Sequence, residues 1–231
     1  MVNLNWQKYP VYKSSGVEWL GDIPEHWEVH KINRCFRTIG SGTTPQSGEP
    51  KYYKNGTISW VITGDLNDGI LEKSSKYLSE TALKEHSALK IFPPGTLLIA
   101  MYAGATIGKV AILNFEGCTN QACCALYGSK NVDTKFTFYW FIGQKKNIIN
   151  LSYGGAQPNI SQQTIKSLKI SVPPLSEQKA IANFLDDKLV KIDKCITLIE
   201  KEIKLTQEYR TSLISETVTG KIDVRKYHPP Q

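Results

Sequence analysis

The sequence predicts an α+β protein: a twisted, β-rich domain with attached helices over residues 1–174, then one long helix in residues 175–231. Two observations predict this fold. Between about 31 and 130, short β-branched and aromatic runs alternate with turns formed by glycine, proline and asparagine. After Pro173-Pro174, apolar residues recur at alternating intervals of three and four, which is the spacing of a helix with one apolar face.

The β-rich domain begins with aromatic and turn residues in 1–30, which predict an irregular arm held by buried rings. Asn55-Gly56 predicts a hairpin turn, because both residues tolerate positive φ. The strands expected after this point are TISWVIT (57–63), TLLIAMY (96–102), KVAIL (109–113) and QACCALY (121–127). This order differs from the regular βαβ alternation of a nucleotide-binding sheet.

The domain is expected to close with helical and extended segments. An amphipathic helix is predicted over about 134–150, with Phe136, Trp140 and Phe141 facing inward. Three short elements follow: the loop SYGGAQPN (152–159), a helical turn capped by Ser161 and the strand LKISV (168–172).

The two prolines predict a stiff elbow, because proline lacks an N–H and disfavours helical conformation in the residue before it. Ser176 is expected to cap a helix over 176–219, which would be about 66 Å long at roughly 1.5 Å per residue. A domain of about 170 residues is only about 35–40 Å across, so another chain is expected to cover the apolar seam. The alternative is a helix packed on its own domain. The seam residues are Ala182, Leu185, Leu189, Ile192, Ile196, Ile199 and Ile203.

Composition limits the function classes. Of 231 residues, 41% are hydrophobic and 21% charged, as in ordinary globular proteins. The sequence contains no run of 18 apolar residues, so no membrane span is predicted. The first residues lack the features of a secretion signal. The five cysteines contain no C-x-x-C pair and the four histidines lack metal-ligand spacing, so we expect a cytoplasmic protein without metal or cofactor.

The net charge of +7 lies mainly in the predicted domain. Residues 1–175 carry 18 Lys and Arg against 12 Asp and Glu, whereas residues 176–231 carry 10 against 9. This surplus is compatible with a polyanion partner, although many basic proteins bind no nucleic acid.

Catalytic motifs are largely missing from the sequence. There is no G-x-G-x-x-G or P-loop. Ser-Val-Pro-Pro-Leu (171–175) lacks the acid or amide and the aromatic ring of the loop used by methyltransferases that act on base amino groups. Asp193 with Glu202-Ile203-Lys204 has the letters of a nuclease motif, but it lies on the flank of the heptad helix. We therefore expect no catalysis by this chain.

The sequence resembles the DNA-specificity (S) subunit of type I restriction–modification enzymes over nearly its whole length. The stretches that carry the resemblance, in order, are GVEWLGDIPEHWEV (16–29), SGTTPQSGEPKYYKNGTISWVITGDLN (41–67), FPPGTLLIAMYAGATIGKVAIL (92–113), TNQACCAL (119–126), GGAQPNIS (154–161) with PPLSEQKAIANFLD (173–186), and LISETVTGKIDVR (213–225).

This resemblance implies an architecture and a set of partners. Full-length members carry two target-recognition domains, each of which reads one half of a split site in double-stranded DNA. Antiparallel helices set the gap between the halves. Methyltransferase (M) subunits dock on these helices and supply the S-adenosylmethionine chemistry, and an ATP-driven restriction (R) subunit adds cleavage. This sequence carries one recognition domain and one helical region, so the resemblance implies a non-catalytic half-subunit that pairs as a homodimer.

Three alternatives remain open at this stage: a stand-alone methyltransferase or nuclease, a specificity chain of a related type II system, and a coiled-coil structural protein whose globular head binds protein. Turnover by the chain alone would favour an enzyme. Salt-dependent DNA retention would argue against a purely structural protein.

The candidate DNA contacts lie in three segments, with lysines expected at phosphates and Gln46 at a base edge. The alternative for the first segment is a polar surface loop whose tyrosines hold the core. For Gln157 and Asn159, a structural or phosphate-facing role is favoured over base reading. The candidates are Thr43, Thr44, Gln46, Ser47, Lys51, Tyr53 and Lys54, then Tyr102 and Thr106, then Gln157 and Asn159; the spacer or dimer candidates are Leu185, Leu189, Ile192, Ile196, Ile199 and Ile203.

Overall fold

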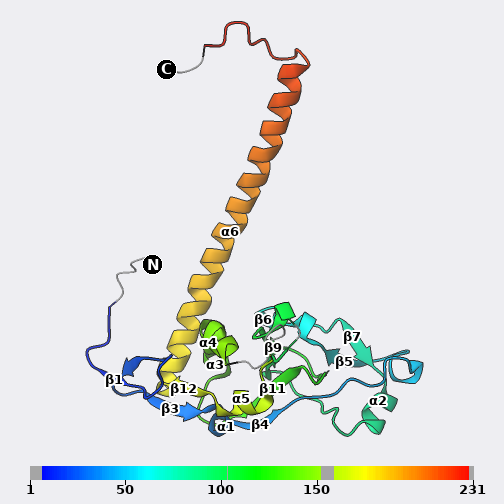
Figure 1. The fold of residues 1–231 in the computed structure, drawn as a ribbon, viewed down its shortest axis with the longest axis vertical. Coiled ribbons are helices and arrows are strands. Elements are labelled where there is room, and N and C mark those ends of the chain that lie inside the picture. The colour runs from blue at the N-terminus through cyan, green and yellow to red at the C-terminus, as the bar shows by residue number, and fades with distance from the viewer. Residues whose placement is uncertain (1–6, 103, 152–158, 229–231) are drawn as a thin grey trace. The chain divides into compact units, whose positions relative to one another are not determined.

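The computed structural model describes residues 7–102, 104–151 and 159–228 (Figure 1). The chain forms two compact units, Met1–Ala182 and Asn183–Gln231. The predicted α+β class is confirmed, since strands and short helices make up the first unit and one long helix dominates the second. Among the described residues, no helix is long and apolar enough to cross a membrane.

A five-stranded sheet forms the centre of the first unit, in the order β4-β11-β8-β9-β6. Its strands are antiparallel neighbours except for the parallel pair β6–β9. Their bounds are β4 (Phe36–Gly40), β6 (Gly69–Leu71), β8 (Leu97–Ala100), β9 (Val110–Leu113) and β11 (Cys123–Ser129). The predicted strands TLLIAMY, KVAIL and QACCALY are therefore confirmed.

Both faces of this sheet are buried. Leu97 and Ile99 of β8 belong to one apolar cluster, whereas Leu98 and Ala100 belong to another on the opposite face. Successive side chains of a strand point to opposite faces, so a strand buried on both faces consists of consecutive apolar residues. This explains why the sequence has unbroken apolar runs here.

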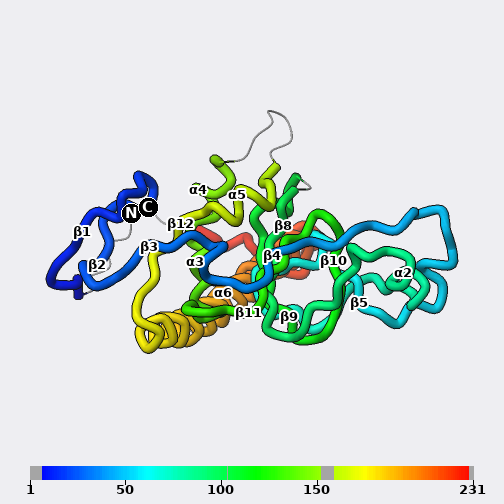
Figure 2. Tube along the Cα trace, turned by 90° about the horizontal axis from the view of Figure 1, so that it is seen from below, coloured from blue at the N-terminus to red at the C-terminus, as the bar shows by residue number. Residues whose placement is uncertain are grey.

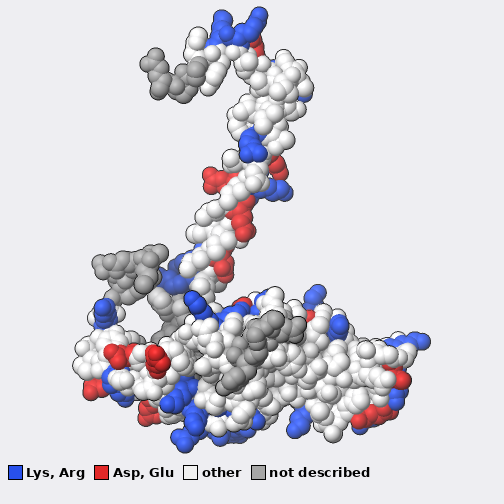
Figure 3. Space-filling view, viewed as in Figure 1, with Lys and Arg blue, Asp and Glu red and all other residues white. Residues whose placement is uncertain are grey.

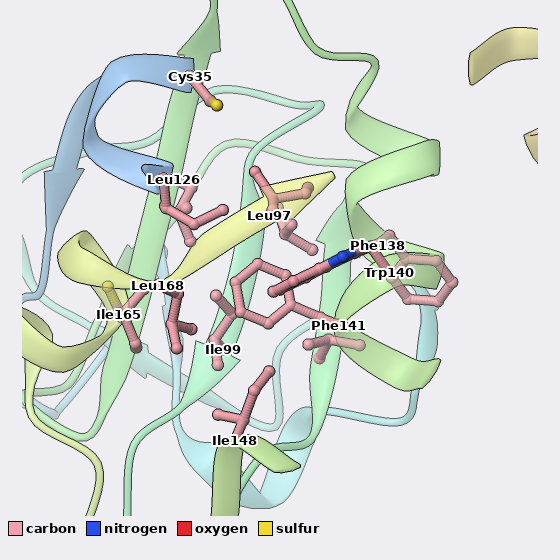
Figure 4. Packing of buried hydrophobic residues seen from close by; sticks show 14 of the residues in the cluster. Cys35, Leu97, Ile99, Leu126, Phe138, Trp140, Phe141, Ile148, Ile165 and Leu168 are labelled. Atoms are coloured by element: carbon pink, nitrogen blue, oxygen red, sulfur yellow. The ribbon is translucent and has the colours of Figure 1, made fainter. Parts of the chain in front are cut away.

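Helices cover one face of the sheet, where Phe141 packs with Leu97 and Ile99 (Figure 4). The helix predicted over 134–150 is two helices, α3 (Thr134–Gly143) and α4 (Lys145–Asn150), interrupted at Gln144. Its inward-facing residues are as predicted, because Phe136, Trp140 and Phe141 are all buried. The Asp133 carboxylate caps α3 by accepting from the Phe136 N–H at 2.9 Å.

A second, three-stranded sheet has the order β10-β5-β7. It consists of β5 (Ile58–Val61), β7 (Lys76–Leu78) and β10 (Cys118–Thr119), beside the helices η1 (Pro50–Tyr52) and α2 (Glu80–Glu85). The hairpin predicted at Asn55-Gly56 is wrong: Asn55 has φ 54°, but η1 precedes it rather than a strand. Gly56 instead permits close approach to β7, because a Cβ there would lie 2.9 Å from the backbone of Tyr77 and Leu78.

The N-terminal arm is more regular than predicted. Two antiparallel pairs form: β1 (Tyr12–Ser14) with β2 (Asp22–Pro24), and β3 (Glu28–Lys31) with β12 (Lys169–Val172). The short helices that complete the unit are α1 (Ile32–Cys35), η2 (Thr63–Asp65), η3 (Gly104–Thr106) and α5 (Gln162–Ser167). The predicted cap of α5 is confirmed, since the Ser161 Oγ accepts from the Thr164 N–H at 2.9 Å.

The long helix α6 (Leu175–Val218) has 44 residues and begins one residue before the predicted start. Ser176 is therefore not its cap. The Pro174 carbonyl accepts from the N–H groups of Glu177 and Gln178 at 2.9 and 3.0 Å. Proline can begin a helix in this way because its fixed φ suits the first turn and its missing N–H has no intrahelical partner there.

Glu177, in the first turn of α6, holds the N-terminal arm. Its carboxylate accepts from the Tyr9 hydroxyl at 2.5 Å and the Trp27 Nε1–H at 3.1 Å, and lies 2.9 Å from His26 Nε2. Burial alone would raise the pKa of Glu177, but these three hydrogen bonds outweigh burial and lower the pKa. The contact is therefore fully present when Glu177 is ionised and weakens as the pH falls through that lowered pKa.

Gln178 is fully buried and joins three backbone segments. Its Oε1 accepts from the Asp133 N–H at 2.6 Å, and its Nε2 donates to the carbonyls of Pro173 at 2.8 Å and Asn131 at 3.1 Å. One side chain thus fixes the start of α6 to the elbow and to the start of α3.

We predict that Gln178→Ala lowers the free energy of unfolding by about 2–4 kcal/mol, because a buried polar group left unpaired costs about 1–3 kcal/mol and the two partly buried partners cost less. Urea unfolding measures the change. The matched control is Lys179→Ala at the next, exposed position, which should change stability by less than about 0.5 kcal/mol. Equal stability of the two variants would contradict this role of Gln178.

Candidate nucleic-acid interface

Three polar segments leave the central sheet at the same edge. β11 is antiparallel to both β4 and β8, with Ala125 opposite Gly40 and Cys123 opposite Ala100. The carboxyl ends of β4 and β8 therefore meet the amino end of β11. This register gathers the loop 41–49, the described residues 101, 102 and 104–106, and the segment 119–122.

The loop after β4 is fixed against the segment before β11. The Gly42 N–H donates to Thr119 Oγ1 at 2.9 Å, and the Thr44 hydroxyl donates to Gln121 Oε1 at 2.5 Å. A Cβ at position 42 would overlap the Thr119 carbonyl oxygen, so only glycine permits this approach.

Aromatic residues support the same loop from inside. The Tyr53 hydroxyl donates to the Pro45 carbonyl at 2.5 Å, and the Trp60 Nε1–H donates to the Thr43 carbonyl at 3.2 Å. Burial raises the pKa of Tyr53. These contacts favour the alternative in which Tyr53 supports the loop, and they engage the backbone of Thr43 rather than its side chain.

The outer surface of the loop consists of the exposed side chains Thr44, Gln46 and Ser47. The two candidate lysines differ from each other. Lys51 lies 2.8 Å from the Glu85 carboxylate, and this hydrogen bond raises the pKa of Lys51. Lys54 is exposed, and it has no ion-pair partner among the described residues.

The candidate segment that contains Tyr102 meets the one that contains Asn159, beside the loop 41–49. The Ile160 N–H donates to the Met101 carbonyl at 2.7 Å, which brings the exposed Asn159 close to Tyr102. Tyr102 is half-buried, its pKa is raised by burial, and its carbonyl accepts from the Thr106 hydroxyl at 3.4 Å. Gln157 lies outside the described residues.

The sequence-based prediction missed Asn120 and Gln121. The Asn120 N–H donates to the Val61 carbonyl at 3.0 Å, and its Oδ1 accepts from the Ala122 N–H at 3.1 Å. Gln121 is exposed beside Thr44. The available signal was the polar sequence Thr-Asn-Gln directly before a buried strand, because such a segment must lie at the edge of the sheet.

In the second unit, the predicted seam is largely exposed. Exposed fractions are 37% for Leu189, 51% for Ile192, 48% for Ile196, 55% for Ile199 and 52% for Ile203, and Leu185 is half-buried. Exposed aliphatic side chains in a row are unfavourable in water.

Four of the five cysteines are buried, and Cys195 is exposed. All five cysteines are free, and burial raises the pKa of Cys124 to about 12 and of Cys35 to about 11, so both thiols stay protonated near neutral pH. Within the described ranges, no three His, Cys, Asp or Glu side chains lie together as a metal site.

This arrangement belongs to a known class of protein. Residues 24–207 match the family described as the type I restriction modification DNA specificity domain, and the chain belongs to that family. The class predicted from the sequence is confirmed. The chain is 30% identical over 216 residues to a putative type I restriction enzyme specificity subunit, MjaX, of Methanocaldococcus jannaschii, covering 93% of this chain and 48% of that protein. It is 26% identical over 233 residues to the EcoR124I/EcoR124II specificity subunit of Escherichia coli, covering 95% and 56%.

Solved structures support the same fold. The HsdS subunit from Thermoanaerobacter tengcongensis matches with a TM-score of 0.59 and 18% identity, covering 80% of this chain and 41% of that one. A chain from a study of complex assembly and conformational transition of the type I R-M system gives a TM-score of 0.69 and 16% identity, covering 89% and 48%. The present chain thus spans about half the length of the curated relatives it matches.

We predict that Gly42→Ala displaces the loop and destabilises the protein by about 1–3 kcal/mol, because the new methyl group overlaps a backbone oxygen. The unfolding temperature and the affinity for DNA should both fall. Gly48→Ala in the same loop is the control, since a Cβ there meets nothing within 4 Å. If Gly42→Ala behaves like Gly48→Ala, the close approach to Thr119 does not hold the loop.

Proposed function

We propose that this chain is the sequence-recognition subunit of a type I restriction–modification complex and binds double-stranded DNA through residues 1–174. The observation that carries the proposal is the gathering of five polar side chains at one edge of the central sheet, four of them exposed and that of Tyr102 half-buried. These are Thr44, Gln46, Tyr102, Gln121 and Asn159.

Such groups suit DNA reading. Amide side chains can donate to and accept from a base edge at once, and hydroxyls can pair with bases or phosphates. The loop needs little further ordering on binding, because Gly42, Tyr53 and Trp60 already fix its backbone. A fixed loop loses less conformational entropy on binding than a mobile one.

The partners follow from the proposed role. Residues 175–231 would act as a helical spacer on which methyltransferase (M) subunits dock, and a restriction (R) subunit would join the same complex. The reaction chemistry would belong to those subunits, and this chain would catalyse nothing. The buried free thiols suit a reducing cytoplasm.

The experiment that tests this function is co-expression of the chain with its M subunit, followed by mapping of methylated bases. A two-part recognition sequence, absent when the chain is omitted, is the expected result. Purified chain is incubated in parallel with DNA, labelled S-adenosylmethionine and magnesium. Methylation or cleavage by the chain alone would replace the proposal with an enzymatic function.

We predict that Gln46→Ala relaxes base preference at one position of each half-site, at a cost of about 1–3 kcal/mol there. Affinities for a set of single-base variants of the site measure the effect. Gln207→Ala on α6 is the control, because it removes the same amide from the second unit. A uniform loss of affinity across all variants would assign Gln46 to positioning instead.

We further propose that two copies pair through the seam of α6. Each fully exposed Leu or Ile costs about 1.5–3 kcal/mol relative to burial, so pairing removes a substantial penalty. An antiparallel pair would recreate two recognition units and would read a symmetric split site. A 44-residue helix is about 66 Å long, which suits half-sites one to two DNA turns apart at about 34–36 Å per turn.

We predict that Ile192→Asp with Ile199→Asp abolishes pairing, because carboxylates would be buried in the seam. Sedimentation at micromolar concentration should give a dimer for the wild type and a folded monomer for the variant. Lys194→Asp with Lys201→Asp has the same seven-residue spacing on another face of α6, and should remain dimeric. A monomeric wild type would rule out self-pairing.

A further inference from the structure

A second surface of the first unit carries unpaired positive charge. It consists of five exposed cations that come from β3, α1, β4, β12 and the end of β11, and we name it the basic track. Its members are Lys31, Arg34, Arg37, Lys130 and Lys169. In Figure 3, Lys and Arg atoms gather along the lower side of this unit, where Figure 1 draws β3, α1 and β4.

Backbone contacts bring these cations together. Lys169 lies directly opposite Lys31 in the antiparallel pair β12–β3, and the Ile32 N–H donates to the Leu168 carbonyl at 2.9 Å. The antiparallel pair β4–β11 continues the track. The Lys130 N–H donates to the Cys35 carbonyl at 2.9 Å, between Arg34 and Arg37 in the chain.

The cations of the track lack the carboxylate partners that other lysines have. Lys51 pairs with Glu85 at 2.8 Å, and Lys145 pairs with Asp68 at 3.4 Å. In the part of the chain that the structure describes, none of the five track residues forms an ion pair. Glu28, on the same strand as Lys31, is engaged with His30 at 2.7 Å.

The repulsion between Lys31 and Lys169 destabilises the folded state. Like charges directly across an antiparallel pair destabilise it. A bound polyanion would neutralise both lysines, and the relief of their repulsion would add to its affinity. The arrangement therefore suits a ligand that presents several negative charges along a line.

We propose that the basic track binds the phosphodiester backbone of double-stranded DNA, at the opposite end of β4 from the loop 41–49; this rests on the proposed function and extends it. β4 connects the two surfaces, since Arg37 lies near its start and the loop begins after Gly40. Figure 2 shows β3, β4 and the following loop as one continuous path across the near side.

The dimensions agree with this arrangement. A five-residue strand is about 17 Å long at roughly 3.3–3.4 Å per residue, and the major groove is about 12 Å wide. Cations at one end of β4 can therefore lie at a phosphate strand while the loop at the other end enters the groove. The track, rather than Lys51, would supply most of the salt-dependent affinity, because Lys51 already has a carboxylate partner.

The test is Lys169→Glu, which converts the opposed lysines into an oppositely charged pair. Thermal stability should stay equal or rise, because the cross-strand repulsion is removed. The slope of log affinity against log salt should fall by about one to two units, since one phosphate contact is lost and the charge of Lys31 is offset. The slope should fall both for DNA that carries the recognition site and for unrelated DNA. Lys169→Arg keeps the positive charge and should retain the wild-type slope.

Lys73→Glu is the matched control. It makes the same charge change at an exposed position between β6 and β7, which Figure 1 draws on the other side of the unit from β3 and β4. A slope for Lys169→Glu that equals the slope for Lys73→Glu would overturn the basic track while leaving DNA recognition intact. Unchanged DNA binding with loss of M-subunit binding would instead assign the track to an acidic protein. A wild type that binds no DNA would overturn the proposed function itself.

Discussion

The register of β11 is the constraint on which the candidate interface depends. Because β11 pairs antiparallel with both β4 and β8, it brings the ends of those strands and its own beginning to one edge. A slip of one residue would exchange the two faces of β11 and move Cys124 and Leu126 from one buried cluster to the other, which is also apolar. Contacts just before the strand favour the observed register, notably Gly42 with Thr119 and the Met101 N–H with the Ala122 carbonyl at 2.8 Å.

The first unit separates two kinds of polar surface. At the loop edge, side chains are neutral, and many of their hydrogen bonds go to the protein's own backbone. On the basic track, side chains are charged and lack carboxylate partners. This division matches the two requirements of DNA recognition, since base edges are read by neutral or bidentate groups and phosphates by cations. Lys51, close to the loop, differs from the track residues because it is paired with Glu85.

The start of α6 is determined differently from the rest of the helix. Glu177 and Gln178 tie its first turn to the N-terminal arm and to α3 through side-chain hydrogen bonds. Beyond Leu185, the seam residues are exposed. A helix in this condition gains stability mainly from a partner that covers its apolar face.

The sequence by itself determined the elements whose signal is local. Apolar runs gave β8, β9 and β11, the heptad spacing gave α6, and Ser161 marked the start of α5, because side-chain periodicity and capping act within a few residues. The tertiary structure decided what depends on distant neighbours. Gly56 serves an approach to β7 rather than a hairpin, Gln144 divides a predicted single helix, and Lys51 is paired with Glu85. Lys31 and Lys169 are 138 positions apart, and only the pairing of β3 with β12 makes them neighbours. Contacts of this kind follow from the packing of the whole unit, which local sequence patterns do not encode.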